Sequence, residues 1–307
     1  MTKCNKFNFQ RIILGVAQFG MPYGVNNPRK SKIPYTAVKE IFKYANKQGI
    51  CELDSSARYG SAEEVIGKFH RRHNRYKISS KFYIDELGDG WGKDKKLEIN
   101  LIKKFIEKKI KLLKVRQLET LYFHSYRDFI RFKKDHSFLR ELKKSKLIRE
   151  LGVSVYLSDE IKQVLFSSAV DIIQCPFSIF DNANERFNDF KKIKRKNKKI
   201  SVRSIFLQGL VFMDPNRLPR KLKSFYDPLI KIQKISKKYQ ISIEEICIRY
   251  VLSFSEIDSI IIGVDSLTQI KRNIKAFRRG PLPQKILNEI HSIKIKNKSL
   301  LLPVNWN

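Results

Sequence analysis

The sequence predicts a (β/α)8 barrel, and three observations support this fold class. Eight short apolar runs alternate with longer segments of helical periodicity, which is typical of βαβ units and a parallel sheet. The alternation runs through the 307 residues without a linker, a Pro-rich tract or a change of composition, so we expect one domain over residues 1–307. The alternative, a doubly wound open sheet, needs a Gly-rich turn after its first strand, and Gly15, Gly20 and Gly24 lack that spacing.

The pattern places each element in order. The expected strands are residues 11–19, 51–55, 76–82, 118–124, 150–155, 171–176, 201–206 and 259–263. The expected helices are 35–47, 62–73, 96–113, 138–146, 159–166, 185–196, 229–239, 243–253 and 267–277. Pro34 before the first helix and Gly49 after it match the usual start and stop signals. Residues 214–226 are a loop-rich insertion, either a segment that folds over a cofactor or a surface excursion.

Three of these strands lead into residues suited to acid–base chemistry. Asp54 lies at the end of the second strand and Tyr59 follows it, while Lys81 and His124 lie at the ends of the third and fourth. The C-terminal ends of barrel strands converge on one face, where barrel enzymes place their chemistry. A phenol has a pKa of about 10, a neighbouring ammonium favours its ionised form, and a carboxylate can hold that ammonium in place. The four residues therefore predict a tuned general acid.

The segment from Asp54 to Gly60, Asp-Ser-Ser-Ala-Arg-Tyr-Gly, resembles the D-[TS]-[AS]-x-x-Y-G phrase of the aldo-keto reductase family. The resemblance extends from Leu14 to Asn273 and implies a (β/α)8 barrel that reduces carbonyl compounds with a nicotinamide cofactor. It implies that Tyr59 donates the proton and that Lys81 lowers the pKa of Tyr59 and relays protons. Asp54 would pair with Lys81, and His124 would orient the carbonyl group.

The same resemblance implies a nucleotide site in the second half of the chain. Ser154 and Gln174 would hold the nicotinamide carboxamide, although Val155 stands where the family has an Asn. Arg203 replaces the aromatic residue whose ring stacks on the nicotinamide; a guanidinium plane can also stack on a ring, and it places a positive charge nearby. The other implied cofactor residues are Ser204, Leu207, Gly209, Gly263, Ser266, Gln269 and Asn273.

The choice between NADP(H) and NAD(H) is left open by the sequence. Gln269 occupies the position of the Arg that pairs with the 2′-phosphate in the family, and Asp265 near this helix end would repel a phosphate. Lys271 and Arg272 are alternative cations, although their helical phase differs. We expect NADH to be used at least as well as NADPH.

The substrate is predicted only as an aldehyde or ketone. Phe19, Tyr83 and Ser125 lie at or just beyond strand ends and are expected to line the pocket. The R-S-x-F-L-Q-G phrase from Arg203 to Gly209 suggests a bacterial sugar or surface-polysaccharide pathway. A regulatory protein that senses nicotinamide nucleotides on the same barrel is the alternative, because Arg203 and Val155 depart from the family pattern.

The composition limits the kinds of partner that we expect the protein to bind. The net charge of +33, from 63 Lys and Arg against 30 Asp and Glu, suggests nucleic acid as a partner. However, the Lys excess is spread along the chain, and its densest cluster lacks aromatics for base stacking.

Four dispersed cysteines lack metal-ligand spacing and favour reduced thiols in the cytoplasm. Neither a signal peptide nor an apolar run of the ~20 residues that span a bilayer is visible. We expect a monomer or small homo-oligomer that binds a small carbonyl compound and no metal, with His70, His73, His136 and His291 on the surface.

Overall fold

Eight parallel strands close into a barrel in the order β1-β2-β3-β4-β5-β6-β7-β8, with β1 also pairing with β8. This computed structural model describes residues 11–27, 31–73, 76–87, 95–132, 136–181 and 184–306. The strands are β1 (Ile12–Gly15), β2 (Glu52–Asp54), β3 (Lys77–Phe82), β4 (Leu118–Phe123), β5 (Ile148–Ser154), β6 (Ile172–Pro176), β7 (Lys199–Arg203) and β8 (Ser259–Gly263). The register sets Gly15 beside both Asp54 and Gly263, so the C-terminal strand ends meet. The prediction of a (β/α)8 barrel is confirmed.

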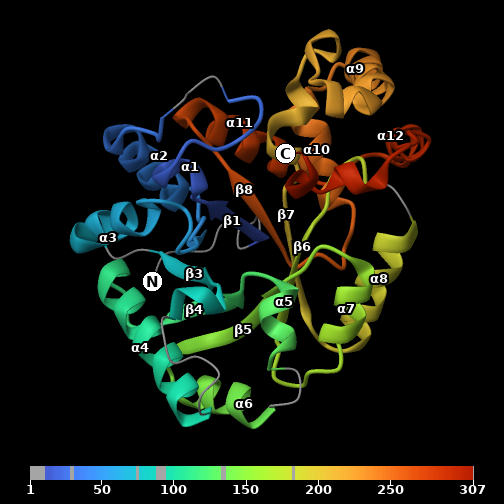
Figure 1. Cartoon of the computed structure of the whole chain (residues 1–307). Coiled ribbons are helices and arrows are strands. Elements are labelled where there is room, and N and C mark those ends of the chain that lie inside the picture. Colours follow the sequence, from blue (N-terminus) through green and yellow to red (C-terminus); the bar gives the residue numbers. More distant parts are fainter. Residues whose placement is uncertain are drawn as a thin grey trace.

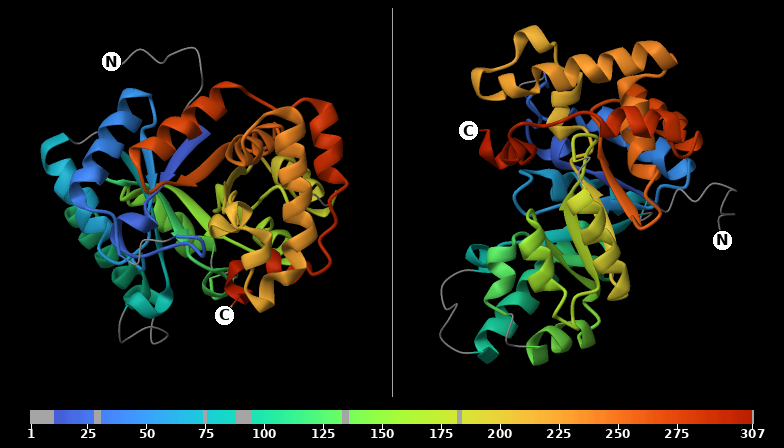
Figure 2. Two further views of the ribbon diagram at one scale, coloured as in Figure 1. Left: turned by 90° about the horizontal axis from the view of Figure 1, so that it is seen from above. Right: turned by 90° about the vertical axis from the view of Figure 1, so that its right-hand side faces the viewer.

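Helices surround the strands in sequence order, as the colours around the barrel in Figure 1 and the turned views in Figure 2 show. The α-helices are α1 (Ala17–Gly20), α2 (Tyr35–Lys47), α3 (Ala62–His73), α4 (Lys95–Leu113), α5 (Tyr126–Ile130), α6 (His136–Lys144), α7 (Ser158–Val164), α8 (Asn184–Arg195), α9 (Tyr226–Tyr239), α10 (Ile243–Leu252), α11 (Leu267–Arg278) and α12 (Gln284–His291). Short 3-10 helices are η2 (Ile84–Leu87), η3 (Leu207–Phe212), η4 (Pro215–Arg217), η5 (Arg220–Phe225), η6 (Lys298–Leu301) and η7 (Pro303–Asn305). The insertion at 214–226 thus consists of 3-10 turns.

The helices pack on the barrel through apolar faces at helical spacing. In α2, Val38, Ile41, Phe42 and Ala45 are fully buried, three and four residues apart, while the intervening positions are more exposed. A buried aliphatic or aromatic side chain contributes roughly 1.5–3 kcal/mol, so such faces fix each helix against its strand. The barrel therefore holds the strand ends rigidly.

The first expected strand, 11–19, was predicted too long. It ends at Gly15, and residues from Ala17 form the short helix α1. This turn directs Phe19 into the core, where its ring is fully buried and meets the ring of Phe42 edge to face at 5.3 Å. Phe19 is therefore a core residue and not a pocket wall.

The prediction that His70 lies on the surface was wrong. Its side chain is 3% exposed, because α3 turns it toward α4 and β3. Its Nδ1 lies 3.0 Å from the carbonyl oxygen of Leu113, and its ring stacks parallel to that of Tyr76. His291 is exposed as expected. The side chains of His73 and His136, and Cys4, lie outside what the structure describes.

None of the described helices is long and apolar enough to cross a membrane. Within the same residues, no group of three His, Cys, Asp or Glu side chains is placed to hold a metal ion.

Candidate active site

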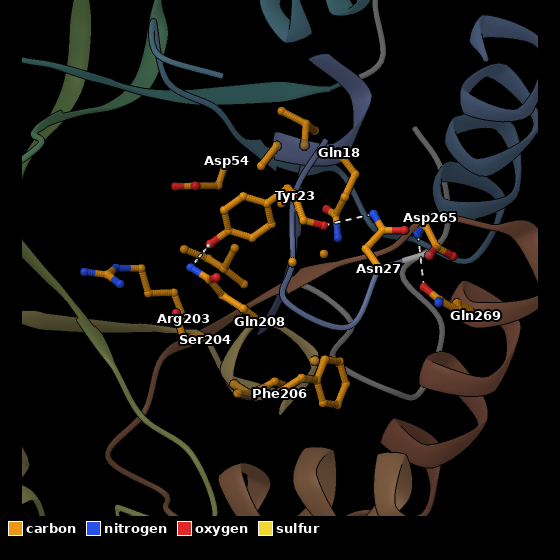
Figure 3. A pocket seen from close by; sticks show the side chains of 18 of the residues that line it. Gln18, Tyr23, Asn27, Asp54, Arg203, Ser204, Phe206, Gln208, Asp265 and Gln269 are labelled. Atoms are coloured by element: carbon orange, nitrogen blue, oxygen red, sulfur yellow. Dashed lines mark hydrogen bonds between the residues drawn. The ribbon is translucent and has the colours of Figure 1, made fainter. Parts of the chain in front are cut away.

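A cavity of about 690 Å³ opens at the C-terminal ends of the strands. Its walls include the last residues of several strands or those just before their ends: Gly15, Asp54, Lys81, Ser154, Arg203 and Gly263. Figure 3 shows Asp54 and Arg203 toward one end, Asp265 and Gln269 toward the other, and Tyr23 and Gln208 between them. After the roles expected from the sequence, we call these the carbonyl end (around Asp54, Tyr59, Lys81, His124 and Arg203) and the nucleotide end (around Glu244, Asp265, Gln269, Arg272 and Asn273).

A buried ion pair lies at the base of the carbonyl end. Lys81 on β3 is 1% exposed; its Nζ pairs with Asp54 on β2 and donates to the carbonyl oxygen of Ser55 at 3.1 Å. The other carboxylate oxygen of Asp54 accepts from Nε2 of Gln174 at 3.0 Å. Burial lowers the pKa of Lys81, and Asp54 opposes that effect. The pair is fully enclosed, so each charge depends on the other.

Close packing of two glycines positions Tyr59 beside this pair. A Cβ on Gly20 would lie 1.9 Å from the carbonyl oxygen of Tyr59, so only glycine permits the two segments to approach. Gly60 adopts a left-handed φ of +54°, and a Cβ there would lie 2.5 Å from the oxygen of Gly20. Lys81 Nζ consequently lies 5.4 Å from the centre of the Tyr59 ring.

The pKa of Tyr59 is raised well above its ordinary value. Burial is the main cause, the charge of Asp54 adds to it, and the charge of Arg203 opposes it. Burial outweighs the opposing charge of Arg203, and the expectation that Lys81 lowers the pKa of Tyr59 stays a prediction. The phenol keeps its proton over the ordinary pH range, as a proton donor must.

His124, just after β4, faces the same cavity in a neutral state. Its Nδ1 lies 3.0 Å from Oγ of Ser56, and its ring meets Tyr59 edge to face at 6.3 Å. Burial, and then the charges of Lys81 and Arg203, lower the pKa of His124 to about 2. If Ser56 donates to Nδ1, the remaining proton sits on Nε2 and can be donated to a bound oxygen.

Two loops meet over the middle of the cavity. Gly24 and Gln208 both have left-handed backbone, and the amide of Val25 donates to the carbonyl oxygen of Gln208 at 2.9 Å. The side-chain amide of Gln208 also donates to the phenol oxygen of Tyr23 at 3.3 Å, the dashed contact in Figure 3. Burial raises the pKa of Tyr23 to about 12. Tyr23 and Gln208 thus supply polar contacts on a mainly buried wall.

Arg203, the last residue of β7, lies against β5 and the loop that follows it. Its Nη2 is 3.4 Å from Oγ of Ser154, and its Cζ is 4.5 Å from the centre of the Tyr156 ring. The backbone of Tyr156 is held in turn, since its carbonyl oxygen accepts from Nη2 of Arg186 at 2.8 Å and its amide donates to Glu160 at 2.6 Å.

At the nucleotide end, Gln269 forms hydrogen bonds at the N-terminus of α11. Its side-chain Oε1 accepts from the backbone amide of Asp265 at 3.0 Å, and its backbone amide donates to Oγ of Ser266 at 3.2 Å. The side chains of Gln269 and Ser266 thus cap the helix. Asn273 lies one turn further along; it is buried, lines the cavity, and its Oδ1 has no partner among the described residues. Arg272 lines the cavity near Glu244, whereas Lys271 lies over the ring of Tyr44.

Most residues singled out from the sequence line this one cavity: Asp54, Tyr59, Lys81, His124, Ser154, Arg203, Ser204, Gly209, Gly263, Gln269 and Asn273. The others do not line it. Gln174 and Leu207 are fully buried, and Ser266 is the N-cap of α11. Ser125 caps α5 through Asp128, and Tyr83 stacks on His124 at 4.3 Å without lining the cavity.

Sequence reasoning missed several lining residues, notably Tyr23, Tyr156, Gln208 and Glu244. It also missed Ser56, which does not line the cavity but contacts His124. Tyr156 follows the end of β5 by two residues, so its position was a signal that could have been used. Tyr23 lies in a loop beyond α1, and Glu244 lies on α10; neither follows a strand end.

Comparisons with known proteins agree on one family. The model described as "Aldo/keto reductase family" matches residues 11–295. The uncharacterized oxidoreductase YqkF of Bacillus subtilis is 23% identical over 268 residues, 82% of this chain and 86% of the relative.

Two solved structures show the same fold. The aldo-keto reductase AKR11C1 from Bacillus halodurans, in its holo form, superposes with a TM-score of 0.70 at 22% identity, over 91% of this chain and 90% of its own. A point mutant of Gox0644 in complex with NADPH has a TM-score of 0.64 at 19% identity, over 93% and 90%.

Proposed function

The chain belongs to the aldo/keto reductase family, and we propose that it reduces an aldehyde or ketone to an alcohol with NADH or NADPH, with Tyr59 as the proton donor. The observation that carries the proposal is the convergence of Tyr59, His124 and the buried Asp54–Lys81 pair on one end of a single cavity. The bound nicotinamide would supply the hydride to the carbonyl carbon. The protein must then stabilise and protonate the carbonyl oxygen.

Each polar residue of the carbonyl end has a role that its contacts support. The protonated phenol of Tyr59 donates to the carbonyl oxygen as negative charge develops there. Neutral His124 offers its second ring nitrogen to the same oxygen. Lys81 returns a proton to Tyr59 after the reaction, and Asp54 holds Lys81 in place.

The residues of the cavity fit a nicotinamide nucleotide. Asn273 Oδ1 is a buried oxygen acceptor on the cavity wall without a partner among the described residues, and a ligand that offers N–H donors would satisfy it. Adenine and a carboxamide both carry such donors. Asn273 would hold the adenine, and Ser154 would hold the carboxamide, with Gln174 behind it. Val155 has a fully buried aliphatic side chain, so this position offers the carboxamide no side-chain hydrogen bond.

The walls favour a hydroxylated carbonyl compound, in line with a sugar-related substrate. Tyr23, Tyr156 and Gln208 add two phenols and an amide to the cavity, all capable of hydrogen bonding to hydroxyl groups. We therefore expect short hydroxyaldehydes to be better substrates than apolar aldehydes of similar size.

The test is carbonyl-dependent oxidation of NADH and NADPH by the purified protein, with paired hydroxylated and apolar aldehydes and ketones. Turnover by the wild type and its loss in Tyr59→Phe would support the proposal. Tight nucleotide binding without turnover of any carbonyl compound would instead favour a nucleotide-sensing protein, the alternative that Arg203 and Val155 keep open.

A further inference from the structure

Arg203 is a cation at the carbonyl end, and none of the carboxylates that the structure describes is paired with it. It lines the cavity together with Tyr59, Lys81 and His124. Its guanidinium contacts the hydroxyl of Ser154 and the ring of Tyr156. No carboxylate in the described part of the chain forms an ion pair with it.

The other cations nearby are paired with carboxylates. Asp54 and Lys81 form a pair with no net charge wherever their shared proton sits. Arg58, near Tyr83, is exposed and paired with Asp85 and Glu86. The carbonyl end therefore carries about one unbalanced positive charge, that of Arg203. The lowered pKa of His124 agrees with this, since the charge of Arg203 contributes to it.

We propose that Arg203 makes this site bind reduced nicotinamide nucleotides more tightly than oxidised ones. The inference rests on the proposed function. For hydride to reach a carbonyl carbon between Tyr59 and His124, the nicotinamide must lie in this end of the cavity, beside Arg203. The reduced ring is neutral and the oxidised ring is cationic, so an unbalanced guanidinium disfavours only the oxidised form. An aromatic residue at this position would not make that distinction.

The charge also affects the reaction cycle. Arg203 opposes the positive charge that appears on the ring as hydride leaves, so the bound nucleotide becomes a weaker reductant, by about 30 mV for each tenfold difference in affinity. The same repulsion speeds release of the oxidised nucleotide. The reduced form is thus selected for binding even when both forms are present.

The experiment measures dissociation constants of NADH and NAD⁺ for the wild type, Arg203→Gln and Arg203→Lys, without any carbonyl substrate. We expect the wild type to bind NADH at least tenfold more tightly. Arg203→Gln should reduce the ratio about tenfold, while Arg203→Lys, which keeps the charge, should retain most of it.

A matched control separates local charge from the overall positive field, which also favours the more negative NADH. Arg272 lines the same cavity at the nucleotide end, so Arg272→Gln should change both dissociation constants alike and leave their ratio unchanged. A local effect should also survive high salt, which screens the long-range field.

Two outcomes overturn different claims. If both nucleotides bind but Arg203→Gln leaves their ratio unchanged, the inference about Arg203 is wrong and the proposed function stands; an increased KM for anionic carbonyl substrates alone would then assign the guanidinium to the substrate. If neither nucleotide binds the wild type, the proposed function fails first.

Discussion

The two ends of the cavity differ in how their polar groups are balanced. At the carbonyl end, Lys81 is enclosed with Asp54, and Gln174 and Ser55 complete their hydrogen bonds. At the nucleotide end, Arg272 is exposed opposite Glu244, and Asn273 keeps an unpaired buried oxygen among the described residues. The ion pair of the first end is assembled before any ligand arrives, whereas Arg272 and Asn273 at the second end leave groups for a ligand to satisfy.

The difference follows from what each end has to do. A proton donor must be held at a fixed distance from the reacting oxygen, so its supporting residues leave little freedom. A nucleotide is recognised through many separate contacts, so one contacting residue can be replaced while the others still bind the nucleotide. Accordingly the four residues that resemble the family's acid–base set are all present, whereas the departures from the family pattern fall at Val155, Arg203 and Gln269, which are expected to contact the nucleotide.

The largest expected effect is that of Tyr59→Phe on catalysis. General acid catalysis contributes about 10²–10⁴-fold, so carbonyl reduction should fall by that factor while nucleotide affinity changes little. Single-turnover reduction and nucleotide binding are measured on the same variant. A rate above about a tenth of the wild type, a loss below ~1.4 kcal/mol, would exclude Tyr59 as the donor.

The second prediction concerns the enclosed pair. Lys81→Met leaves Asp54 buried without its partner, which should cost about 3–5 kcal/mol of unfolding free energy. The double variant with Asp54→Asn should recover part of that loss. Arg272→Met is the matched change at the nucleotide end, and should cost less than about 1 kcal/mol because Arg272 is exposed. If denaturant titrations show that Lys81→Met and Arg272→Met lower the free energy of unfolding equally, the claim that only the carbonyl end encloses its charges is wrong.

The third prediction is a change of cofactor preference. Gln269→Arg places a cation where Gln269 now caps α11, and a charge-assisted bond to a 2′-phosphate contributes roughly 1.5–3 kcal/mol. NADPH should therefore gain about tenfold or more over NADH in affinity, while the wild type uses NADH at least comparably.

Dissociation constants at two salt concentrations check this shift. Of the two alternative cations for the 2′-phosphate, Arg272 lines the cavity and Lys271 does not, so Arg272 is the candidate to test. A wild-type preference for NADPH beyond about a hundredfold that survives high salt and disappears in Arg272→Gln would mean that Arg272 binds the phosphate.

The fold was predictable because strand and helix periods are local properties of the sequence. All eight strands were expected in order, and α2 and α3 at their observed bounds. Errors arose where tertiary packing decides, as at Phe19, which α1 turns into the core, and at His70, which packs under α4. The carbonyl end was foreseeable because its residues follow strand ends. Tyr23 and Glu244 were not, because only folding brings their loop and helix to the cavity.

The smallest expected effect is that of pH on the chemical step. The lowered pKa of His124, about 2, and the raised pKa of Tyr59 leave both groups in one protonation state from about pH 5 to pH 9. Single-turnover rates should therefore be nearly flat over this range. Stability should respond instead, because His124 gains its proton only on unfolding, where its pKa is about 6.5. Below that pH the folded state should lose up to about 1.4 kcal/mol per pH unit, and His124→Gln should lose less. A rate profile with an inflection near pH 6.5 that vanishes in His124→Gln would mean that His124 titrates in the folded protein, and that the carbonyl end is less enclosed than its contacts indicate.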